Sequence, residues 1–398
     1  MKFTKFALFA ACASFAAAKG LYEIEETATP VDYTLNLGAG FDSNTSPITS
    51  NAIGEQESFF ASASVGASTQ YSKPHYSLAT SLNVGILQYF TENIIENDRN
   101  INGTGRLNFT YNFDELNRFT SQNFVFTGLE PDQTNDVARD RRDGEYTSYS
   151  TRNLFGHRWS ERVGTEHGFA FQGANYDSGA EFSKFTLVND VRYSYDDKTR
   201  FTAGHNYIEN NNDTTAHRFT VGINRKLSSK TGATLDLGYS SLENAAGSTS
   251  ASPYANFSLK HQLSEKSVIN AFASYLQDDT FAGRRTDFDS TTGFTSAQFE
   301  VRTTLRFGIS TSYQLSEKLS LFGGANFVNT VLEDETTSVT SDGELVLDLF
   351  TISAGARYAL TENVALSLSG LITESSADEA TTYDYTRNLY NLGVVASF

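Results

Sequence analysis

The segment FEVRTTLRFGISTSYQL, residues 299–315, alternates between two kinds of side chain without interruption. Its odd positions carry Phe, Val, Thr, Leu, Ile and Tyr, and its even positions carry Glu, Arg, Thr, Gly, Ser and Gln. Successive side chains of a β-strand point to opposite faces, so this period of two predicts a strand with one apolar and one polar face. Two environments fit such a strand: a soluble sandwich with a core and a wet face, or a membrane barrel with a lipid face and a lumen.

Short polar turns recur along the chain, and alternating segments flank each of them. These turns are residues 71–75, 113–118, 159–164, 195–200, 227–232, 263–267, 315–319 and 360–364. Longer polar connections, such as LQDDTFAGRRTDFDS, lie between them. Short turns at one end and long loops at the other are typical of bacterial outer-membrane barrels. With a first strand near Val31 and a last strand ending at Phe398, we expect an all-β fold: one transmembrane antiparallel up-and-down barrel of about 18 strands, or 16 if one hairpin is miscounted. The short turns are then periplasmic and the long loops extracellular.

The first residues, MKFTKFALFAACASFAAAKG, have the organisation of a secretory signal peptide. Lys2 and Lys5 form a basic start, residues 6–15 are apolar, and residues 16–18 are small alanines that suit cleavage. We therefore predict a cleaved signal peptide over 1–18, a short periplasmic lead over 19–30 and the barrel over 31–398. A lipoprotein signal at Cys12 is a weaker alternative. Export and a mature chain without cysteine favour the bacterial outer membrane.

The overall charge of the chain argues against nucleic acid as a partner. The full chain has a formal charge of −17, and loss of the two leader lysines leaves 28 basic against 47 acidic residues. A nucleic-acid-binding domain is expected to be basic. No nucleic-acid partner is therefore predicted.

Aromatic residues end the apolar register just before the short turns. They are Tyr71, Tyr111, Phe113, Trp159, Tyr193, Tyr195, Tyr313 and Tyr358. Rings at the headgroup level form such girdles in membrane barrels. A soluble sandwich would have no reason to gather its aromatic residues at one edge, so this feature favours the membrane barrel.

The polar register of the descending strands predicts a basic lumen. It contains eleven basic residues: Arg106, Arg152, Arg158, Arg192, Arg218, Lys226, Lys260, Arg302, Arg306, Arg357 and Arg387. Against them stand Asp190, Glu300 and, from a nearly uncharged set of ascending strands, Asp236. Any barrel turns its charges inward, because a charge facing lipid costs about 2–4 kcal/mol near the midplane. The inward orientation of these charged side chains therefore needs no functional explanation. The excess of basic over acidic residues, however, favours anions as the solutes. Loops folded into the lumen could change that sign.

Signatures of catalysis and of metal binding are missing from the sequence. None of the six histidines lies in a metal-binding helix motif, and the nucleophile-elbow and phosphate-loop motifs do not occur. We expect no enzyme activity, no cofactor and no metal site, and we expect most histidines at turns or at the membrane interface.

The first and last strands carry a resemblance to a known class. In YTLNLGAGFDSN, residues Gly38, Gly40, Phe41, Asp42 and Asn44 match the Gly-x-Gly-aromatic-Asp-x-Asn opening of the putative outer-membrane β-barrel porin family of Gram-negative bacteria, which the chain resembles along its mature length. The ending is similar to the β-signal read by the barrel-assembly machinery, with Tyr390, Leu392, Val394 and Phe398 in one register. Ala396 departs from that pattern.

The resemblance and the lumen charges together predict an outer-membrane channel for passive diffusion of small hydrophilic, preferentially anionic solutes. Two alternatives remain: an exporter of an anionic exopolysaccharide, since some members of the resembled family are associated with such export, and a structural or adhesive barrel with a plugged lumen. The expected surroundings are outer-membrane lipid, lipopolysaccharide and the assembly machinery. No residue of the sequence predicts the oligomeric state.

Overall fold

The computed structural model describes residues 31–45, 57–90, 99–129, 145–176, 181–211, 213–243, 247–279, 284–289, 293–298, 301–333, 344–378 and 384–398. The signal peptide and lead predicted over 1–30 lie outside these residues, so both boundaries stay predictions. No helix in the described part of the chain is long and apolar enough to cross a membrane.

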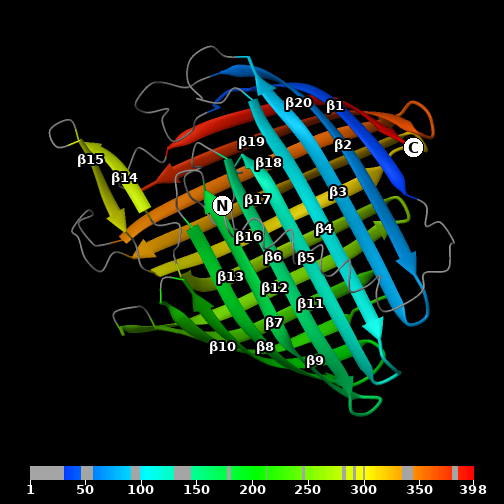
Figure 1. The fold of residues 1–398 in the computed structure, drawn as a ribbon, viewed down its shortest axis with the longest axis vertical. Helices are drawn as coiled ribbons and strands as arrows, with labels where there is room; N and C mark the ends of the chain where they lie inside the picture. Colours follow the sequence, from blue (N-terminus) through cyan, green and yellow to red (C-terminus); the bar gives the residue numbers. More distant parts are fainter. Residues whose placement is uncertain are drawn as a thin grey trace, which may run out of the picture.

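Twenty strands follow one another along the described chain (Figure 1). In order they are β1 (Asp32–Asp42), β2 (Ser58–Ser72), β3 (Tyr76–Tyr89), β4 (Arg99–Asn112), β5 (Asn117–Leu129), β6 (Glu145–Arg158), β7 (Val163–Tyr176), β8 (Glu181–Ser194), β9 (Thr199–Asn210), β10 (Thr215–Lys226), β11 (Thr231–Glu243), β12 (Thr249–Ser264), β13 (Ser267–Asp279), β14 (Arg284–Asp289), β15 (Gly293–Gln298), β16 (Val301–Gln314), β17 (Leu319–Glu333), β18 (Glu344–Ala359), β19 (Val364–Ala377) and β20 (Tyr385–Ser397). Eighteen of them form one sheet, and β14 and β15 form a separate pair.

The predicted barrel of 18 antiparallel strands is confirmed, and the alternative of 16 is excluded. Each of the eight predicted short turns joins two strands of the main sheet, beginning with the turn between β2 and β3 and ending with the turn between β18 and β19. Polar groups of the turns fix several of them: the Asp114 carboxylate accepts hydrogen bonds from the backbone N–H groups of Leu116 and Asn117, both at 2.7 Å. Because these hydrogen bonds involve residues that are close together in the chain, the turns could be predicted from the sequence.

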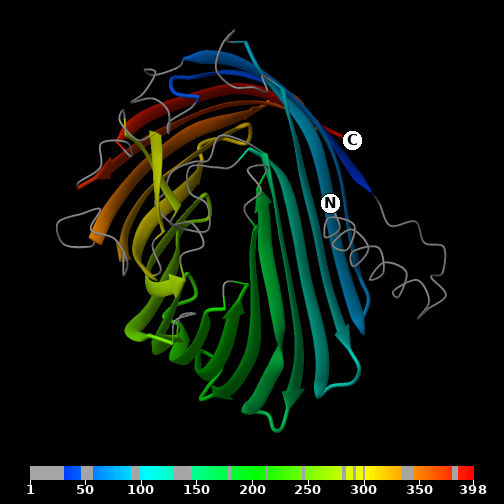
Figure 2. The ribbon, with the colours of Figure 1, turned by 60° about the vertical axis from the view of Figure 1, so that its left-hand side comes forward.

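The sheet closes on itself because β1 pairs with β20 as well as with β2. At the turn end of this seam, the N–H of Tyr33 donates to the carbonyl of Phe398 at 3.1 Å, and the N–H of Phe398 donates back at 2.9 Å. Figure 2 shows the strands enclosing a central space. Closure pairs the backbone groups of both terminal strands and leaves the main sheet no free edge.

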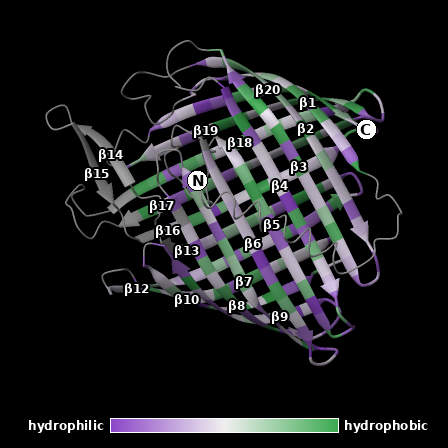
Figure 3. Cartoon of the chain, in the orientation of Figure 1, coloured by the Kyte–Doolittle hydropathy of each residue, from purple (hydrophilic) through white to green (hydrophobic). Residues whose placement is uncertain are grey.

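The pairing register divides every strand into two faces. Residues directly opposite each other in an antiparallel pair lie on the same face, and the face that contains Arg306 can be followed from strand to strand around the full circuit back to Arg306. The alternation of hydrophobic and hydrophilic residues along the strands is visible in Figure 3. On β16, the face away from Arg306 presents Leu305, Phe307 and Ile309 as exposed side chains.

One long connection differs from the expectation. The residues between β13 and β16 were predicted as a loop, whereas 284–289 and 293–298 form the hairpin β14–β15. The hairpin stands at the loop end of the barrel (Figure 1). Each strand of this hairpin is only six residues long, so alternation alone does not distinguish it from a polar loop.

Candidate functional site: an arginine-rich lumen

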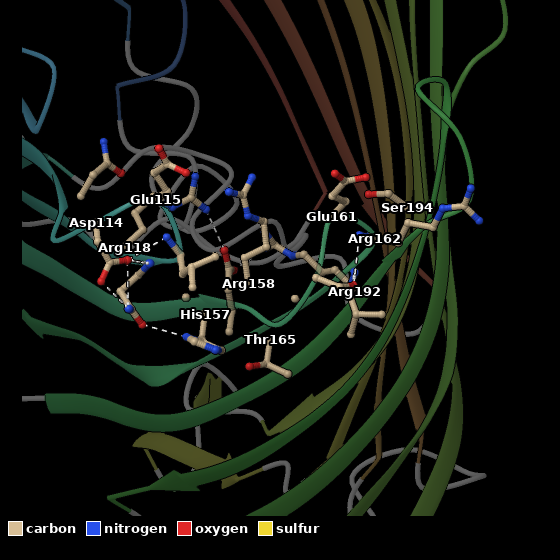
Figure 4. Close-up of a pocket in the computed structure, with 18 of the residues that line it drawn as sticks. Asp114, Glu115, Arg118, His157, Arg158, Glu161, Arg162, Thr165, Arg192 and Ser194 are labelled. Atoms are coloured by element: carbon tan, nitrogen blue, oxygen red, sulfur yellow. Dashed lines mark hydrogen bonds and ion pairs between the residues drawn. The ribbon is translucent and has the colours of Figure 1, made fainter.

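The face that contains Arg306 is the inner one. Figure 4 shows Arg118, Arg158 and Arg192 on the concave side of their strands. Among the eleven basic residues predicted for the lumen, ten have described side chains on this face: Arg106, Arg152, Arg158, Arg192, Arg218, Lys226, Lys260, Arg306, Arg357 and Arg387. Asp190 and Asp236 lie on it too. The backbone of Arg302 follows the same register, but its side chain and the whole of Glu300 lie outside the described residues.

The ascending strands contribute more charge than the sequence suggested. They carry Asp32, Asp42, Arg118, Glu166 and Arg200 on the inner face, and β8 adds Lys184. Among the described side chains, the inner face therefore holds thirteen basic and five acidic residues. The expectation of nearly uncharged ascending strands was wrong for β1, β5, β7 and β9, each of which bears one or two inward charges among uncharged residues. The excess of basic residues persists.

Glu166 on β7 binds two arginines of the inner wall, Arg118 on β5 and Arg192 on β8. Its carboxylate accepts a hydrogen bond from Arg118 at 3.0 Å, and its other oxygen is bound by Arg192. Only 7% of the Glu166 side chain is exposed, against 49% for Arg118 and 34% for Arg192. One carboxylate thus neutralises one of two guanidinium groups, and the trio keeps a net positive charge.

Aromatic rings on the inner wall support other arginines. The guanidinium of Arg306 lies 4.9 Å from the centre of the Phe272 ring and donates through Nε to Asn326 at 3.0 Å. Arg218 lies 4.9 Å from the ring of Tyr254, and Arg106 lies 5.4 Å from the ring of Phe124. Cation–π contacts of this kind hold the flat guanidinium against the wall. The sequence analysis missed these rings because a lumen was expected to be polar.

A recess of about 450 Å³ lies at the turn end of β5–β9 (Figure 4). It is lined by the turns after β4 and β6 and by four inward arginines, Arg118, Arg158, Arg192 and Arg200, with Glu166 beside them. In the turn at its rim, hydrogen bonds from the side chain of Asn117 and from backbone N–H groups lower the pKa of Asp114. The recess therefore combines fixed carboxylates at its rim with arginines on its wall.

Recesses of about 320 and 510 Å³ continue the same wall toward the loop end. The recess of about 320 Å³ shares Arg118, Glu166 and Arg192 with the recess at the turns. The recess of about 510 Å³ shares Arg152 with the 320 Å³ recess and is also lined by Arg106. Basic side chains thus follow the wall over much of its height. For Arg152, Arg158, Arg200 and Arg218, the structure shows no ion pair to a described carboxylate. Their charge is available to a solute in the lumen.

Arg387 has a different environment from the other lumen arginines. It donates through Nε and Nη2 to the two carboxylate oxygens of Asp42 at 2.9 and 2.6 Å, and the hydroxyl of Tyr89 donates to the same carboxylate at 3.1 Å. Asp42 is fully buried, and Arg387 is 8% exposed. This bidentate pair ties β1 to β20, so Arg387 closes the seam rather than presenting a charge to solutes.

The motif behind the family resemblance sits at this seam. Asp42 is its acidic residue, and the N–H of Asn44 donates to the Asp42 carboxylate at 3.2 Å. Gly40 lies where a Cβ atom would come within 2.1 Å of the Tyr390 carbonyl oxygen. The motif thus has a structural explanation, because it allows the first and last strands to approach and locks them together.

The outer wall carries the predicted aromatic residues. Tyr71, Tyr111, Phe113, Trp159, Tyr193, Tyr195, Tyr313 and Tyr358 lie on or just beyond the turn ends of descending strands, in the outward register where they fall in a strand. The indole of Trp159 donates to the Thr165 hydroxyl at 3.1 Å. The proposed assembly residues Tyr390, Leu392, Val394 and Phe398 are also exposed on the outside. Whether they serve as girdle and assembly signal stays a prediction.

Apolar side chains cover the outside between these ends. Val65, Val221, Leu368 and Leu392 are each more than half exposed and point outward from four different strands. A closed strand wall with an apolar outside and a charged inside is the arrangement of a membrane-spanning β-barrel. The chain belongs to this class of protein. Among the described residues, no group of three or more His, Cys, Asp or Glu side chains could hold a metal ion.

Comparisons with known proteins give structural likenesses at low sequence identity. No protein-family model matches the chain, and no curated protein matches it in sequence. The crystal structure of OccAB4 from Acinetobacter baumannii is similar with a TM-score of 0.46 and 10% identity, over 94% of this chain and all of that one. OccAB3 from the same organism gives 0.47 and 11%, over 92% and 99%. The FrpB iron transporter from Neisseria meningitidis (F3-3 variant) gives 0.44 and 11%, over 89% and 64%. The class of this chain follows from its own closed sheet and apolar outer wall.

Proposed function

We propose that the chain is a bacterial outer-membrane channel for passive diffusion of small hydrophilic solutes, with a preference for anions. The observation that carries the proposal is the charge of the inner wall. Nine of the thirteen described inward basic residues come from β4–β10, whereas Glu166 and Asp190 are the described inward acids of those strands. A wall of one sign in a confined aqueous space concentrates solutes of the opposite sign.

The size of the barrel supports a channel. Barrels of 16–18 strands leave an aqueous lumen, whereas barrels of about eight strands fill theirs with side chains. Aromatic support and the Glu166 bridge hold several guanidinium groups against the wall, which leaves space beside them for a passing solute. The outer membrane is the proposed location because closed antiparallel barrels with apolar outer bands and short turns at one end are typical of it.

The test is the reversal potential of the purified protein in a planar bilayer under a KCl gradient. We expect wild-type openings to favour chloride. Arg152→Gln combined with Arg158→Gln removes two lumen charges that have no described ion pair, and it should shift the reversal potential toward that of potassium. The matched control, Lys230→Gln with Lys318→Gln, removes two charges from exposed turns and should leave selectivity nearly unchanged.

Three results would contradict the proposal. A wild-type barrel that conducts but prefers potassium would show that the inner arginines do not set selectivity. A barrel that stays silent at all potentials would favour a plugged lumen. Equal shifts in the lumen and turn variants would mean that total charge, rather than the charge of the inner wall, determines which ion passes.

A second function is favoured by one feature, the continuity of the basic wall. The three recesses share residues and bring Arg106, Arg152, Arg118 and Arg192 into one series along the strands. A series of cations suits a polymer that carries repeated negative charges, so export of an anionic polysaccharide is the alternative. A soluble polyanion that blocks chloride current at low concentration from one side only would favour this alternative, whereas unaltered current would favour small solutes.

A further inference from the structure

The outer wall of β5–β9 carries polar side chains within the height of the lipid-facing band. They are Asn123, Thr151, Asn153, His167, Asn189 and His205, which together we name the outer polar patch. Register places them outward: Asn153 lies opposite Phe169, and His167 lies opposite Phe155, both of which are exposed. Asn189 lies opposite both His167 and His205. The patch therefore runs across adjacent strands on the outside of the barrel.

The depth of the patch can be read from the strand positions. Its members lie four to seven residues from the turn ends of their strands. With about 3.3 Å per residue and strands tilted by roughly 40°, this corresponds to about 10–18 Å above the turns, inside an apolar band about 25 Å tall. At the same distance from the turns, other strands present Ile309, Leu368 and Leu392. His167 and His205 are exceptions to the expectation that most histidines lie at turns or the membrane interface.

Hydrogen bonds within the patch satisfy part of its polar groups. Thr151 donates to the Oδ1 of Asn123 at 2.8 Å, and the Nδ2 of Asn153 donates to Thr151 at 2.9 Å. The Nδ1 of His167 lies 3.0 Å from the Oδ1 of Asn189. No partner among the described residues is recorded for the Oδ1 of Asn153, the Nε2 of His167 or the Nδ2 of Asn189.

These remaining groups include both donors and acceptors. The Asn189 amide oxygen accepts from Nδ1 of His167, so in a neutral imidazole Nε2 is an acceptor, and the Asn189 amide still has N–H groups to donate. In hydrocarbon neither kind of group finds a partner, and exposure there is costly. A lipid-facing wall with these residues is therefore incomplete without a protein surface against it.

We propose that the outer polar patch is the contact between two copies of this chain, packed side by side about a two-fold axis along the membrane normal. Copies inserted in the same way lie at the same depth, so a two-fold axis through β7 brings each polar residue to residues at its own height. The axis places β6 of one copy against β8 of the other, where the Asn189 amide can donate to the Oδ1 of Asn153 in both directions. Exposed rings beside the patch, such as Phe155 and Phe169, supply rigid contact area.

The first experiment measures association of full-length protein in nanodiscs and by native mass spectrometry in mild detergent. We expect wild-type dimers. His167→Leu combined with Asn189→Leu should raise the dimer dissociation constant at least about tenfold, because hydrogen bonds within a membrane are individually modest but both copies lose theirs together. Ile309→Ala with Leu368→Ala, at the same depth on another part of the wall, is the matched control and should leave the dimer intact.

The second experiment measures distances between spin labels and leaves the residues of the outer polar patch unchanged. Its result therefore does not depend on whether the patch variants fold. A spin label at Val191→Cys on β8 should show short distances between copies, whereas one at Leu321→Cys on β17 should show long ones or none. A monomeric wild type, a patch variant that dimerises as well as the control, or short distances at Leu321 would overturn the proposal. A different protein bound to the patch in place of a second copy would overturn it as well.

Discussion

Replacement of Asp42 by alanine should strongly destabilise the barrel at its seam. Asp42 lies fully buried on β1 and accepts two hydrogen bonds from Arg387 on β20 and one from the hydroxyl of Tyr89 on β3. The substitution removes the acceptor for these three bonds and for the backbone N–H of Asn44, and it leaves a nearly buried guanidinium without its counter-charge. The contact joins residues 345 positions apart in the chain, so it holds together strands that no turn connects.

The size of the effect follows from burial and bond number. Breaking a buried ion pair by removing one partner typically costs about 3–5 kcal/mol, because the remaining charge stays desolvated. We expect a loss of about 3–5 kcal/mol in the free energy of unfolding for Asp42→Ala. Replacing both partners with apolar residues, Asp42→Leu with Arg387→Met, should recover most of that loss, since neither charge is then left buried alone.

Unfolding of detergent-refolded protein in urea, followed by tryptophan fluorescence and by heat-modifiable gel mobility, measures these differences. Arg357→Ala removes an inward arginine that is exposed and has no recorded ion pair, and it is the control expected to change stability by less than about 0.5 kcal/mol. A loss below about 1 kcal/mol for Asp42→Ala would refute the reasoning. A double variant less stable than both single variants would refute it too, because it would show that the charges themselves are not the source of the cost.

Three further predictions concern the lumen, the seam and one turn. Glu166→Gln should make the channel more selective for anions, by releasing the two arginines that the carboxylate binds, and should lower stability by about 1–2 kcal/mol. Gly40→Ala should destabilise the barrel by about 1–3 kcal/mol, because its new Cβ would meet the carbonyl oxygen of Tyr390. Asp114, whose pKa is lowered chiefly by Asn117, should stabilise its turn above its unfolded pKa of about 3.9, and this contribution should disappear as the pH falls through the lower folded value.

Each of these has a direct measurement. The reversal potential checks Glu166→Gln, and a shift toward potassium would contradict the assignment of Glu166 to the lumen. Urea unfolding checks Gly40→Ala, for which an unchanged midpoint would show that the strands can separate slightly at no cost. Comparing the midpoints of wild type and Asp114→Ala at pH 7 and pH 2.5 checks the turn: the difference should be present at pH 7 and smaller at pH 2.5.

The barrel could be predicted from local features of the sequence. Alternation is a property of single strands, and turn chemistry is a property of four to six neighbouring residues, so both can be read without knowing what lies alongside. Strand count, pairing order and the inward direction of residues such as Arg306 follow from these two signals. The hairpin β14–β15 is the exception among the strands, since its two alternating segments are short and rich in polar residues.

The contacts inside the barrel could not be predicted in the same way. Asp42 and Arg387 meet only because the sheet closes, and Glu166 meets its two arginines because three separate strands bring them to one height. Tyr254 and Phe272 were assigned no role, since an aromatic residue on the polar register conflicts with a simple rule of apolar outside and polar inside. Their contacts with arginines depend on distances between strands, which periodicity does not contain.

Closure of the sheet by β1 and β20 also determines the order in which the barrel can form. Hairpins between neighbouring strands involve short loops and form readily, whereas the seam brings together segments separated by nearly the whole chain and must overcome a large loop-closure entropy. We therefore expect the bond between Asp42 and Arg387 to form late in folding, after the transition state. Interactions of that kind slow unfolding while leaving the folding rate almost unchanged. On this reasoning, the buried pair should give the finished barrel a long lifetime in the membrane.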